Sequence, residues 1–591
     1  MKNKSRFIGS MVLLLMALLV LGGCPTGTSG TETQNPGNPP SNPSGPSGPS
    51  IPTKTPVQLA SELVSTLNRG LAAGAEIVER VGSTVTVKNN FTVGTGPGEI
   101  AAVTIPGGVT FSVPDGKTVT IAGGTTTVSA GGKVEVAGNG TLTKTGGTFN
   151  FSPGAVVFKV DLETTDIGSG SKGLNDRITG AKKLGPGTVM ELTPDFYEDV
   201  ENNVTTAIVT DAGPDRNTIP YTIKGQGTAD DDPSLPVGIL LANDKVTLDE
   251  MKVEITIPTQ AAITTSNTRY TAGISISRYD GTSILTGDNL ANNDVTVKNC
   301  KVTYAIDPLD TNTSYTHNAG IYVSGASGPS VTPRKIIIEG NTVETSGRGT
   351  AAAQGVVVQY YDPSIVIKNN TLSSGTGGAE TVNAPAAALF LNINPATITD
   401  PTVSPQITGN TLDGHNIDFY VNIFSTGDYK GVEDLFNSKF GTYYSTWATD
   451  TTDNFYRKLY TALIGQSKAT GYAGLFFMVL GGTAGSYDGY CFVYEAWEKS
   501  SGVVTAVDYW GATILSSGTA LAYNAGSGSN MYDTDAAAGT SGNGHFNTQK
   551  AGYRGRINLT TDPKSYDNFK FHPTDGNSQG SYSWADGVTS L

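Results

Sequence analysis

The residues best suited to acid–base chemistry are an arginine and two aspartates at equivalent places in two repeated segments. Arg278 and Asp280 follow the strand-like segment 273–277, and Asp362 follows the similar segment 355–359. Clustered carboxylates can act as acid and base on a glycosidic bond, and an arginine can stabilise developing negative charge. However, no Asp-x-Asp or Asp-Asp pair stands at a strand end there. An enzyme would use Arg278, Asp280 and Asp362, but the sequence favours a protein without a catalytic site.

Aromatic side chains gather in the same strand-like segments and in the loops that follow them. Sugar rings stack on aromatic faces, so such a stripe suits a neutral glycan chain. The alternative is that these are ordinary surface tyrosines that cap strand edges. The candidate ligand-binding residues are Tyr279, Tyr322, Gln359, Tyr360, Tyr361 and Phe390.

Other kinds of site are not indicated by the residue pattern. The chain has four histidines and three cysteines, with no zinc-ligand spacing and no serine or cysteine placed for a nucleophilic triad. We therefore expect neither a metal site nor a cofactor. The formal net charge is −14, and it becomes −17 if a leader carrying Lys2, Lys4 and Arg6 is removed. This disfavours nucleic acid as a partner.

Two short patterns that alternate along the chain must position these residues. One pattern has a strand of β-branched residues followed by a turn with asparagine. The other begins with glycine or alanine and alternates inward-facing apolar residues with outward-facing residues. Fixed strands with variable loops between them predict stacked coils. The first pattern occupies residues 295–302, 336–343, 365–372 and 405–412, with a degenerate copy at 246–253, and the second occupies 273–277, 320–324, 355–359 and 388–392.

The period of two within each strand predicts which side chains face outward. In the glycine-led strands this gives an outward column that contains Ser275, Tyr322, Val357 and Phe390, and Asp418 and Tyr420 follow in the next strand. In the other strands Lys298, Glu339 and Lys368 share a column, which predicts a cross-strand charge ladder more than a catalytic base. The repeated Asn341, Asn370 and Asn410 predict a buried asparagine ladder more than a set of sugar ligands.

The segment before the repeats has a recognisable order of elements. A short helix near 174–178 precedes Pro186 and Gly187, a strand, Tyr197 and a strand that ends in Lys224-Gly225-Gln226-Gly227. This order resembles the opening of the pectin-lyase-like right-handed parallel β-helix. With the repeats, the resemblance covers roughly residues 174–424. It implies the fold, but lyases, hydrolases, epimerases, adhesins and stalks all use it.

The first residues resemble the leader of a bacterial lipoprotein. A basic start and an apolar run too short to span a membrane end at Leu21-Gly22-Gly23-Cys24, which is similar to a lipobox. The resemblance implies that Cys24 carries diacylglycerol and anchors the protein to a membrane. Residues 24–56 are rich in Pro, Gly and Ser and are expected to form an extended tether.

The remaining segments complete the predicted organisation. Residues 1–23 form the signal peptide. Residues 57–160 hold a helix, with Thr55 as its N-cap, that covers the end of the solenoid. The same segment then forms a short-turn β-solenoid, for which a set of hairpins is the alternative. Residues 174–424 form the β-helix, and 425–591 form a mixed α+β cap or recognition domain, with a helix at 452–464 and strands at 474–480, 490–494 and 503–510. The fold class is all-β.

These features predict a lipid-anchored protein of the cell envelope, extracytoplasmic and on the outer membrane or the cell surface. The expected role is a non-catalytic scaffold or an adhesin-like binder of a neutral polysaccharide or a surface protein. The alternative is a polysaccharide lyase or glycoside hydrolase of the same fold. A purely mechanical spacer remains a third hypothesis.

Overall fold

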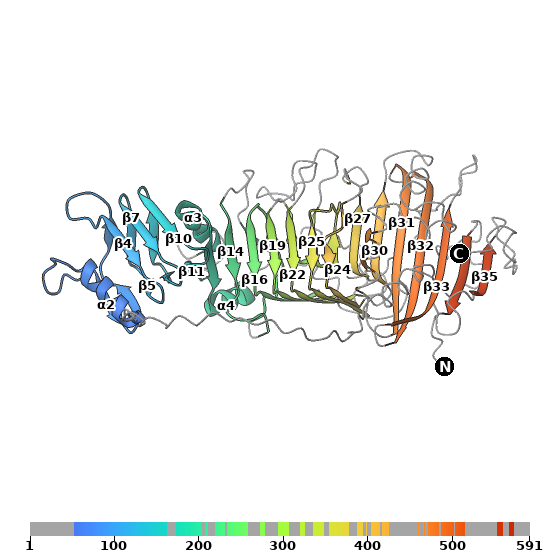
Figure 1. Ribbon diagram of the computed structural model, residues 1–591, viewed down its shortest axis with the longest axis horizontal. Helices are drawn as coiled ribbons and strands as arrows, with labels where there is room; N and C mark the ends of the chain where they lie inside the picture. Colours follow the sequence, from blue (N-terminus) through green and yellow to red (C-terminus); the bar gives the residue numbers. More distant parts are fainter. Residues whose placement is uncertain are drawn as a thin grey trace, which may run out of the picture.

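The computed structural model shows an elongated stack of mostly parallel strands, with α2 near one end and β35 near the other (Figure 1). The described strands form two sheets of twelve strands each, one of five strands and two of three strands. The residues that the structure describes are 53–161, 173–203, 207–210, 219–230, 233–257, 272–277, 294–306, 319–324, 335–347, 354–376, 387–393, 398, 403–413, 417–424, 458–459, 462–463, 466, 471–483, 486–500, 503–513, 552–558 and 566–572. Cys24 and the leader lie outside them.

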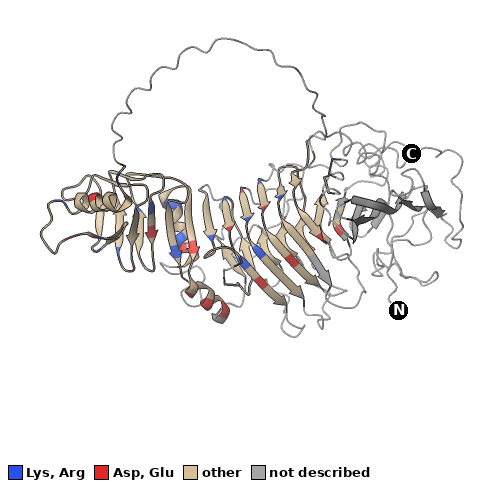
Figure 2. Ribbon diagram, turned by 60° about the horizontal axis from the view of Figure 1, so that its bottom comes forward, with Lys and Arg blue, Asp and Glu red and all other residues tan. Residues whose placement is uncertain are grey.

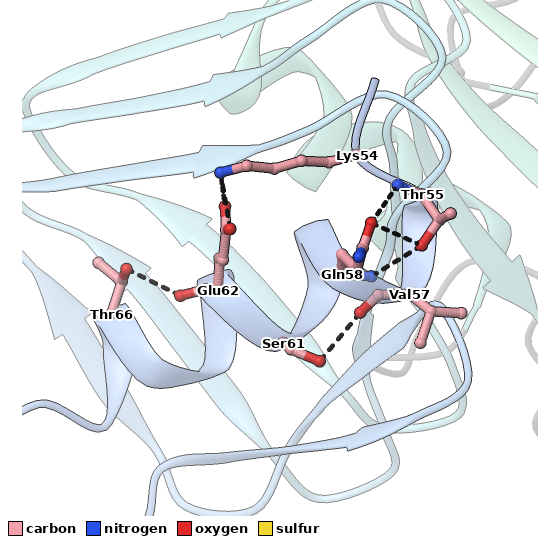
Figure 3. A network of polar contacts seen from close by, with 7 residues as sticks. All are labelled: Lys54, Thr55, Val57, Gln58, Ser61, Glu62 and Thr66. Carbon is pink, nitrogen blue, oxygen red and sulfur yellow. Dashed lines mark hydrogen bonds and ion pairs between the residues drawn. The ribbon is translucent and has the colours of Figure 1, made fainter. Parts of the chain in front are cut away.

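The N-terminal helix α2 (Pro56–Leu67) is fixed by a capping box. The backbone N–H of Gln58 donates to Thr55 Oγ1 at 3.3 Å, and the N–H of Thr55 donates to Gln58 Oε1 at 2.8 Å (Figure 3). These bonds satisfy donors that a helix start leaves open. The apolar face of α2 buries Leu63 and Leu67 in the same core as the first strands. The predicted N-cap and capping helix are therefore confirmed.

The predicted short strands are confirmed, and they form coils and not hairpins. After β1 (Val78–Val81), which pairs antiparallel with β2, every strand pair in this segment is parallel, in the orders β2-β5-β8-β11, β3-β6-β9 and β4-β7-β10. Three short strands therefore make one coil. The strands are β2 (Thr84–Val87), β3 (Phe91–Val93), β4 (Ala102–Ile105), β5 (Thr110–Val113), β6 (Thr118–Ile121), β7 (Thr125–Val128), β8 (Lys133–Val136), β9 (Thr141–Lys144), β10 (Thr148–Phe151) and β11 (Val156–Val160).

Two helices, α3 (Leu174–Leu184) and α4 (Pro194–Asn203), lie where the short coils give way to longer ones. The buried guanidinium of Arg177 in α3 donates to the carbonyl oxygens of Gly138 and Gly140 and lies 5.3 Å from the ring centre of Phe158. Burial lowers the pKa of Arg177 to about 10. The helix thereby holds the last short turns against the first long coil.

The longer coils are built from three sheets around one apolar core. Sheet 1 continues directly from β11 through β12 (Thr188–Leu192), β14 (Tyr221–Lys224), β16 (Val246–Asp249), β19 (Val295–Lys298), β22 (Ile336–Glu339), β25 (Val366–Lys368) and β28 (Ile407–Thr408). Sheet 2 contains β13 (Ile208–Thr210), β15 (Ile239–Leu241), β18 (Ala272–Ile276), β21 (Ala319–Val323), β24 (Gln354–Val358), β27 (Ala387–Ile393) and β30 (Ile417–Phe424). Sheet 3 contains β17 (Lys252–Ile257), β20 (Lys301–Ile306), β23 (Thr342–Gly347), β26 (Thr371–Thr376) and β29 (Thr411–Asp413).

A buried asparagine ladder joins successive coils between sheet 1 and sheet 3, as predicted. Asn341 Nδ2 donates to Asn370 Oδ1 at 2.9 Å, and Asn370 Nδ2 donates to Asn410 Oδ1 at 2.8 Å. Each amide also donates to a strand carbonyl of the preceding coil. Because these side chains are almost fully buried, each bond replaces one that water would otherwise make. The ladder locks one coil in register with the next.

The ladder ends on Gln466, a residue from beyond the repeats. Gln466 Oε1 accepts from Asn410 Nδ2 at 2.6 Å, and Gln466 Nε2 donates to the carbonyl oxygen of Ile407 at 2.9 Å. Nearby, Leu459 and Leu463 are helical and fully buried in the main core. These residues fall within the predicted helix at 452–464, and they cover the last coil.

Sheet 2 extends beyond the coils. β31 pairs parallel with β30, and the following strands form an antiparallel series with it. The three predicted C-terminal strands are confirmed within β31 to β33. The strands are β31 (Gly471–Thr483), β32 (Ser486–Ser500), β33 (Val503–Thr513), β34 (Gly552–Asn558) and β35 (Tyr566–His572).

Within the described part of the chain, no helix has the length and apolar character that crossing a membrane requires.

Candidate functional site

The candidate site is the outer face of sheet 2, where two rows of residues run from coil to coil in strand register. We call Ser275, Tyr322, Val357, Phe390 and Tyr420 the stacking row, because they are paired in register on five successive strands. Two residues further along the strands lie the members of the amide row, and the even spacing puts them on the same face. The amide row consists of Ser324, Gln359 and Asn392.

Backbone alternation explains why the rows form. In each strand the residues on either side of the stacking row, such as Ile321 and Val323, are fully buried in the main core. The residue between them must then face outward. The predicted inward and outward assignment of the glycine-led strands is therefore confirmed for Ser275, Tyr322, Val357 and Phe390.

One hydrogen bond joins two members of the amide row: Asn392 Nδ2 donates to Gln359 Oε1 at 2.7 Å. The backbone of Gln359 is held by its own N–H, which donates to the carbonyl oxygen of Val323 in the preceding strand at 2.9 Å. Gln359 and Asn392 are half-buried, so their amides are held in place and remain partly accessible. Fixed amides beside an apolar strip are a common arrangement for sugar hydroxyls.

The stacking row is more buried than the sequence suggests. Tyr322 and Val357 are only 6% and 4% exposed, and with Ala272 and Ala319 they form a small apolar cluster separate from the main core. Phe390 packs on the edge of this cluster and is half-buried. Burial, with a smaller contribution from Tyr360, raises the pKa of Tyr322 to about 12. Phe390 is thus the better placed of the two rings for contact with a ligand.

Tyr361 is not a surface residue, which corrects the sequence prediction. Its side chain is 0% exposed and belongs to the main core, and burial raises its pKa well above the usual range. The reason is the preceding residue: Tyr360 has φ of 55°, in the left-handed region. This turn breaks the simple alternation that placed both tyrosines on one face. Tyr360 itself stays half-buried beside the stacking row.

The predicted acidic residues do not form a described cluster. Asp362 is 9% exposed, and its Oδ1 accepts from the N–H of Ser364 at 2.9 Å and from the Ser364 hydroxyl, which is a turn-stabilising role. Asp418 was expected to face outward, but it is 0% exposed. Arg278, Tyr279 and Asp280 lie outside the described residues.

The outer face of sheet 1 has a different character, because its charges are paired among themselves. The predicted column of Lys298, Glu339 and Lys368 is confirmed, with Lys298 Nζ 2.9 Å from Asp249 Oδ2 and Lys368 Nζ 2.9 Å from Glu339 Oε1. Figure 2 shows that basic (blue) and acidic (red) positions both occur along the stacked strands. The full column, the charge ladder, consists of Lys159, Glu191, Lys224, Asp249, Lys298, Glu339 and Lys368.

Sequence reasoning found only the last three members of the charge ladder. Lys159, Glu191 and Lys224 lie before the recognised repeats, but each is at or next to the end of a strand with alternating apolar residues. Lys159 pairs with Glu191, and Lys224 pairs with Glu250 at 2.7 Å; the hydrogen bond to Glu250 raises the pKa of Lys224. A cation held in this way is a poor candidate for a catalytic base.

Among the described residues, no group of three or more His, Cys, Asp and Glu side chains is arranged to hold a metal ion. The chain matches no protein-family model, and neither a curated protein nor a solved structure matches it. The chemistry of this surface therefore has to be inferred from its own residues.

Proposed function

We propose that this chain is a lipid-anchored, extracytoplasmic protein whose coils form a right-handed parallel β-helix of the pectin-lyase-like kind. In this proposal the outer face of sheet 2 binds a neutral polysaccharide without cleaving it. The observation that carries the proposal is the register of the stacking row beside the amide row. The half-buried rings of Tyr360 and Phe390, next to the fixed amides of Gln359 and Asn392, suit contact with a sugar chain.

The proposed location at a membrane is inferred from the sequence. A basic start, an apolar run, the Leu21-Gly22-Gly23-Cys24 box and a Pro-, Gly- and Ser-rich tether occur in the order of a lipoprotein leader. Lipid on Cys24 would hold the protein at a membrane, because buried acyl chains contribute about 0.8 kcal/mol per methylene. The tether would let the coils project away from the bilayer.

The non-catalytic role is supported by how the charged residues are used. Lys298 and Lys368 are engaged in ion pairs at the protein surface, and the carboxylate of Asp362 accepts from the turn that follows it. Charges in such structural roles lack the isolated, desolvated setting that tunes a catalytic acid or base.

The proposal is tested by screening residues 25–591 on a glycan array and then measuring affinity for the retained glycans. We expect neutral polysaccharides to be retained. Phe390→Ala should weaken binding by roughly tenfold or more, since a central aromatic contact contributes about 2 kcal/mol. Ile337→Ala is the matched control, because Ile337 faces outward on sheet 1 of a nearby coil; its affinity should be unchanged.

Two results would contradict the proposal. Retention that is equal in wild type and Phe390→Ala, or the capture of surface proteins but no glycan, would remove the assigned ligand. Release of shortened or unsaturated sugars from pectate, alginate or a retained neutral polysaccharide would show that the chain is an enzyme.

A further inference from the structure

The connection between α2 and β1, residues 69–76, is an exposed apolar loop. Residues 70–75 read Gly-Leu-Ala-Ala-Gly-Ala, so they have no polar side chain, and all six are exposed. Leu71 alone is 43% exposed. Beyond the adjacent residues, no heavy atom lies within 4 Å of the position that a Cβ would take on Gly70 or Gly74. The apolar loop therefore stands clear of the rest of the protein, and contiguous exposed apolar surface commonly marks a place that a partner or a membrane covers.

The base of the apolar loop is clamped by the side chain of Asn68, the C-cap of α2. Asn68 Oδ1 accepts from the N–H of Ile77 at 2.9 Å, and Asn68 Nδ2 donates to the carbonyl oxygen of Val78 at 2.8 Å. Within the loop, the N–H of Ala75 donates to the carbonyl oxygen of Ala72 at 2.9 Å. Because these bonds set the shape of the loop in advance, little conformational freedom is lost when its tip is buried in a partner.

The two charged residues of the apolar loop differ in their surroundings. Glu76 is partnered, because its Oε2 lies 3.9 Å from Lys88 Nζ. Arg69 is exposed, and it forms no ion pair within the described part of the chain. In the surface of a bilayer, apolar side chains enter the boundary of the acyl chains while cations stay among anionic headgroups. An apolar tip beside an unpaired cation matches that arrangement.

The place of the apolar loop in the chain favours the membrane as its partner. α2 lies at one end of the stack, and the loop follows it directly (Figure 1). In the proposed function Cys24 carries lipid, and thirty-one residues, 25–55, separate it from Pro56 at the start of α2. A flexible chain of that length spans about 30 Å. The bilayer is then present at the loop at a high effective concentration, whereas another partner has to arrive from solution.

We propose that the apolar loop inserts Leu71 into the surface of the bilayer that holds the lipid anchor, so that the stack stands on its α2 end. This inference rests on the proposed lipid anchor and adds an orientation to it. Because the strands of sheet 2 follow one another along the stack, docking at one end keeps Tyr360 and Phe390 away from the membrane and open to a glycan.

The first test compares residues 25–591 in solution with the same chain held on vesicles by an N-terminal hexahistidine tag and a nickel-chelating lipid. The vesicles contain phosphatidylethanolamine and phosphatidylglycerol. Hydroxyl-radical oxidation of Leu71 should fall several-fold on the vesicles. Val403 is the matched control, because it is 37% exposed and lies just before β28, at the other end of the coils. Its oxidation should not change.

The second test measures how variants of the untagged chain sediment with these vesicles. Leu71→Asp should bind at least roughly tenfold more weakly than wild type, since burial of a leucine accounts for that much. Ala73→Glu changes another exposed residue of the apolar loop and should act in the same direction. Arg69→Gln should bind about fivefold more weakly, but should match wild type on vesicles of phosphatidylcholine alone. Val403→Asp should bind as wild type does.

The outcomes distinguish this inference from the proposed function. If Leu71 is as reactive on vesicles as in solution, or if Leu71→Asp sediments as wild type does, docking through the apolar loop is wrong, and glycan binding by sheet 2 stands. If Leu71→Asp instead converts a wild-type dimer into monomers without vesicles, the loop binds a second copy and not a membrane. If mass spectrometry of the full chain finds no diacylglycerol on Cys24, the proposed anchor fails, and this inference fails with it.

Discussion

Sheet 1 and sheet 2 are built from the same coils, yet their outer faces are used differently. On sheet 1, the charge ladder places each cation next to an acid, as in the pair of Lys368 and Glu339. On sheet 2, the outward positions of those coils hold Tyr322, Val357 and Phe390, beside the amides of Gln359 and Asn392.

This difference shows how a repeat can separate stability from recognition. Charges that alternate along a column satisfy one another and leave little for a partner. Aromatic rings and amides at the same spacing can repeat without repulsion and still offer contacts to a ligand that runs along the stack. The asparagine ladder keeps both faces in one register, since it fixes how each coil lies on the next.

The largest effect is expected from breaking this shared register at Asn370. Asn370→Leu would leave the N–H and the Nδ2 amide of Asn341 without their acceptor and the Ile338 carbonyl without a donor. Each buried polar group left unsatisfied costs about 1–3 kcal/mol, so the free energy of unfolding should fall by about 4 kcal/mol. Chemical unfolding followed by circular dichroism measures it.

The control for that change is the next residue along. Asn369 is exposed and has φ of 56°, so Asn369→Gly keeps the turn and should change the free energy of unfolding by less than about 1 kcal/mol. Equal losses for Asn369→Gly and Asn370→Leu would mean that the turn, and not the ladder, sets the register.

An intermediate effect is expected at high pH on sheet 2 alone. Burial raises the folded-state pKa of Tyr322 to about 12, from an ordinary value of 10.0. The folded state holds this proton more tightly, so the stabilisation is complete below pH 10.0 and is lost as the pH rises towards about 12. Between pH 10.0 and about 12, the unfolding free energy of wild type should fall with rising pH more steeply than that of Tyr322→Phe. The difference should be up to about 1.4 kcal/mol per pH unit.

Urea unfolding across this pH range measures the effect of Tyr322→Phe. Tyr304 and Tyr361, whose pKa values burial also raises, still contribute to the alkaline loss in that variant. Glu339→Gln on sheet 1 is the comparison, and its alkaline profile should match wild type. An unchanged profile in Tyr322→Phe would contradict the burial of this ring.

The smallest effect is expected from the charge ladder. Glu339→Lys would place like charges beside each other in the column and should lower the unfolding free energy by about 1 kcal/mol, and Glu339→Gln by about 0.5 kcal/mol. Because these side chains are over a third exposed, added salt should recover most of the loss. Glycan affinity should stay at the wild-type value in both; a change would assign a binding role to sheet 1.

The sequence predicts those features that depend on local spacing. The N-cap at Thr55, the alternation in the glycine-led strands and the repeated asparagines all follow from short periods in the chain, and the structure bears them out. The register of the stacking row follows in the same way, because the repeats align one strand with the next.

Other features depend on contacts or backbone angles that spacing does not reveal. The left-handed turn at Tyr360 sends Tyr361 into the core, and alternation alone could not show this. Gln466 completes the asparagine ladder from outside the repeats, because only the folded chain brings it to the last coil. The burial of Tyr322 likewise reflects packing with Ala272 and Ala319 from neighbouring strands.

The most direct test of the difference between the two faces is hydroxyl-radical footprinting of residues 25–591 with and without a retained glycan. Binding along sheet 2 predicts that the oxidation of Phe390 and Tyr360 falls when glycan is added, while that of Ile337 and Val366 on sheet 1 does not change. Protection of Ile337 and Val366, with Phe390 unaffected, would contradict the account.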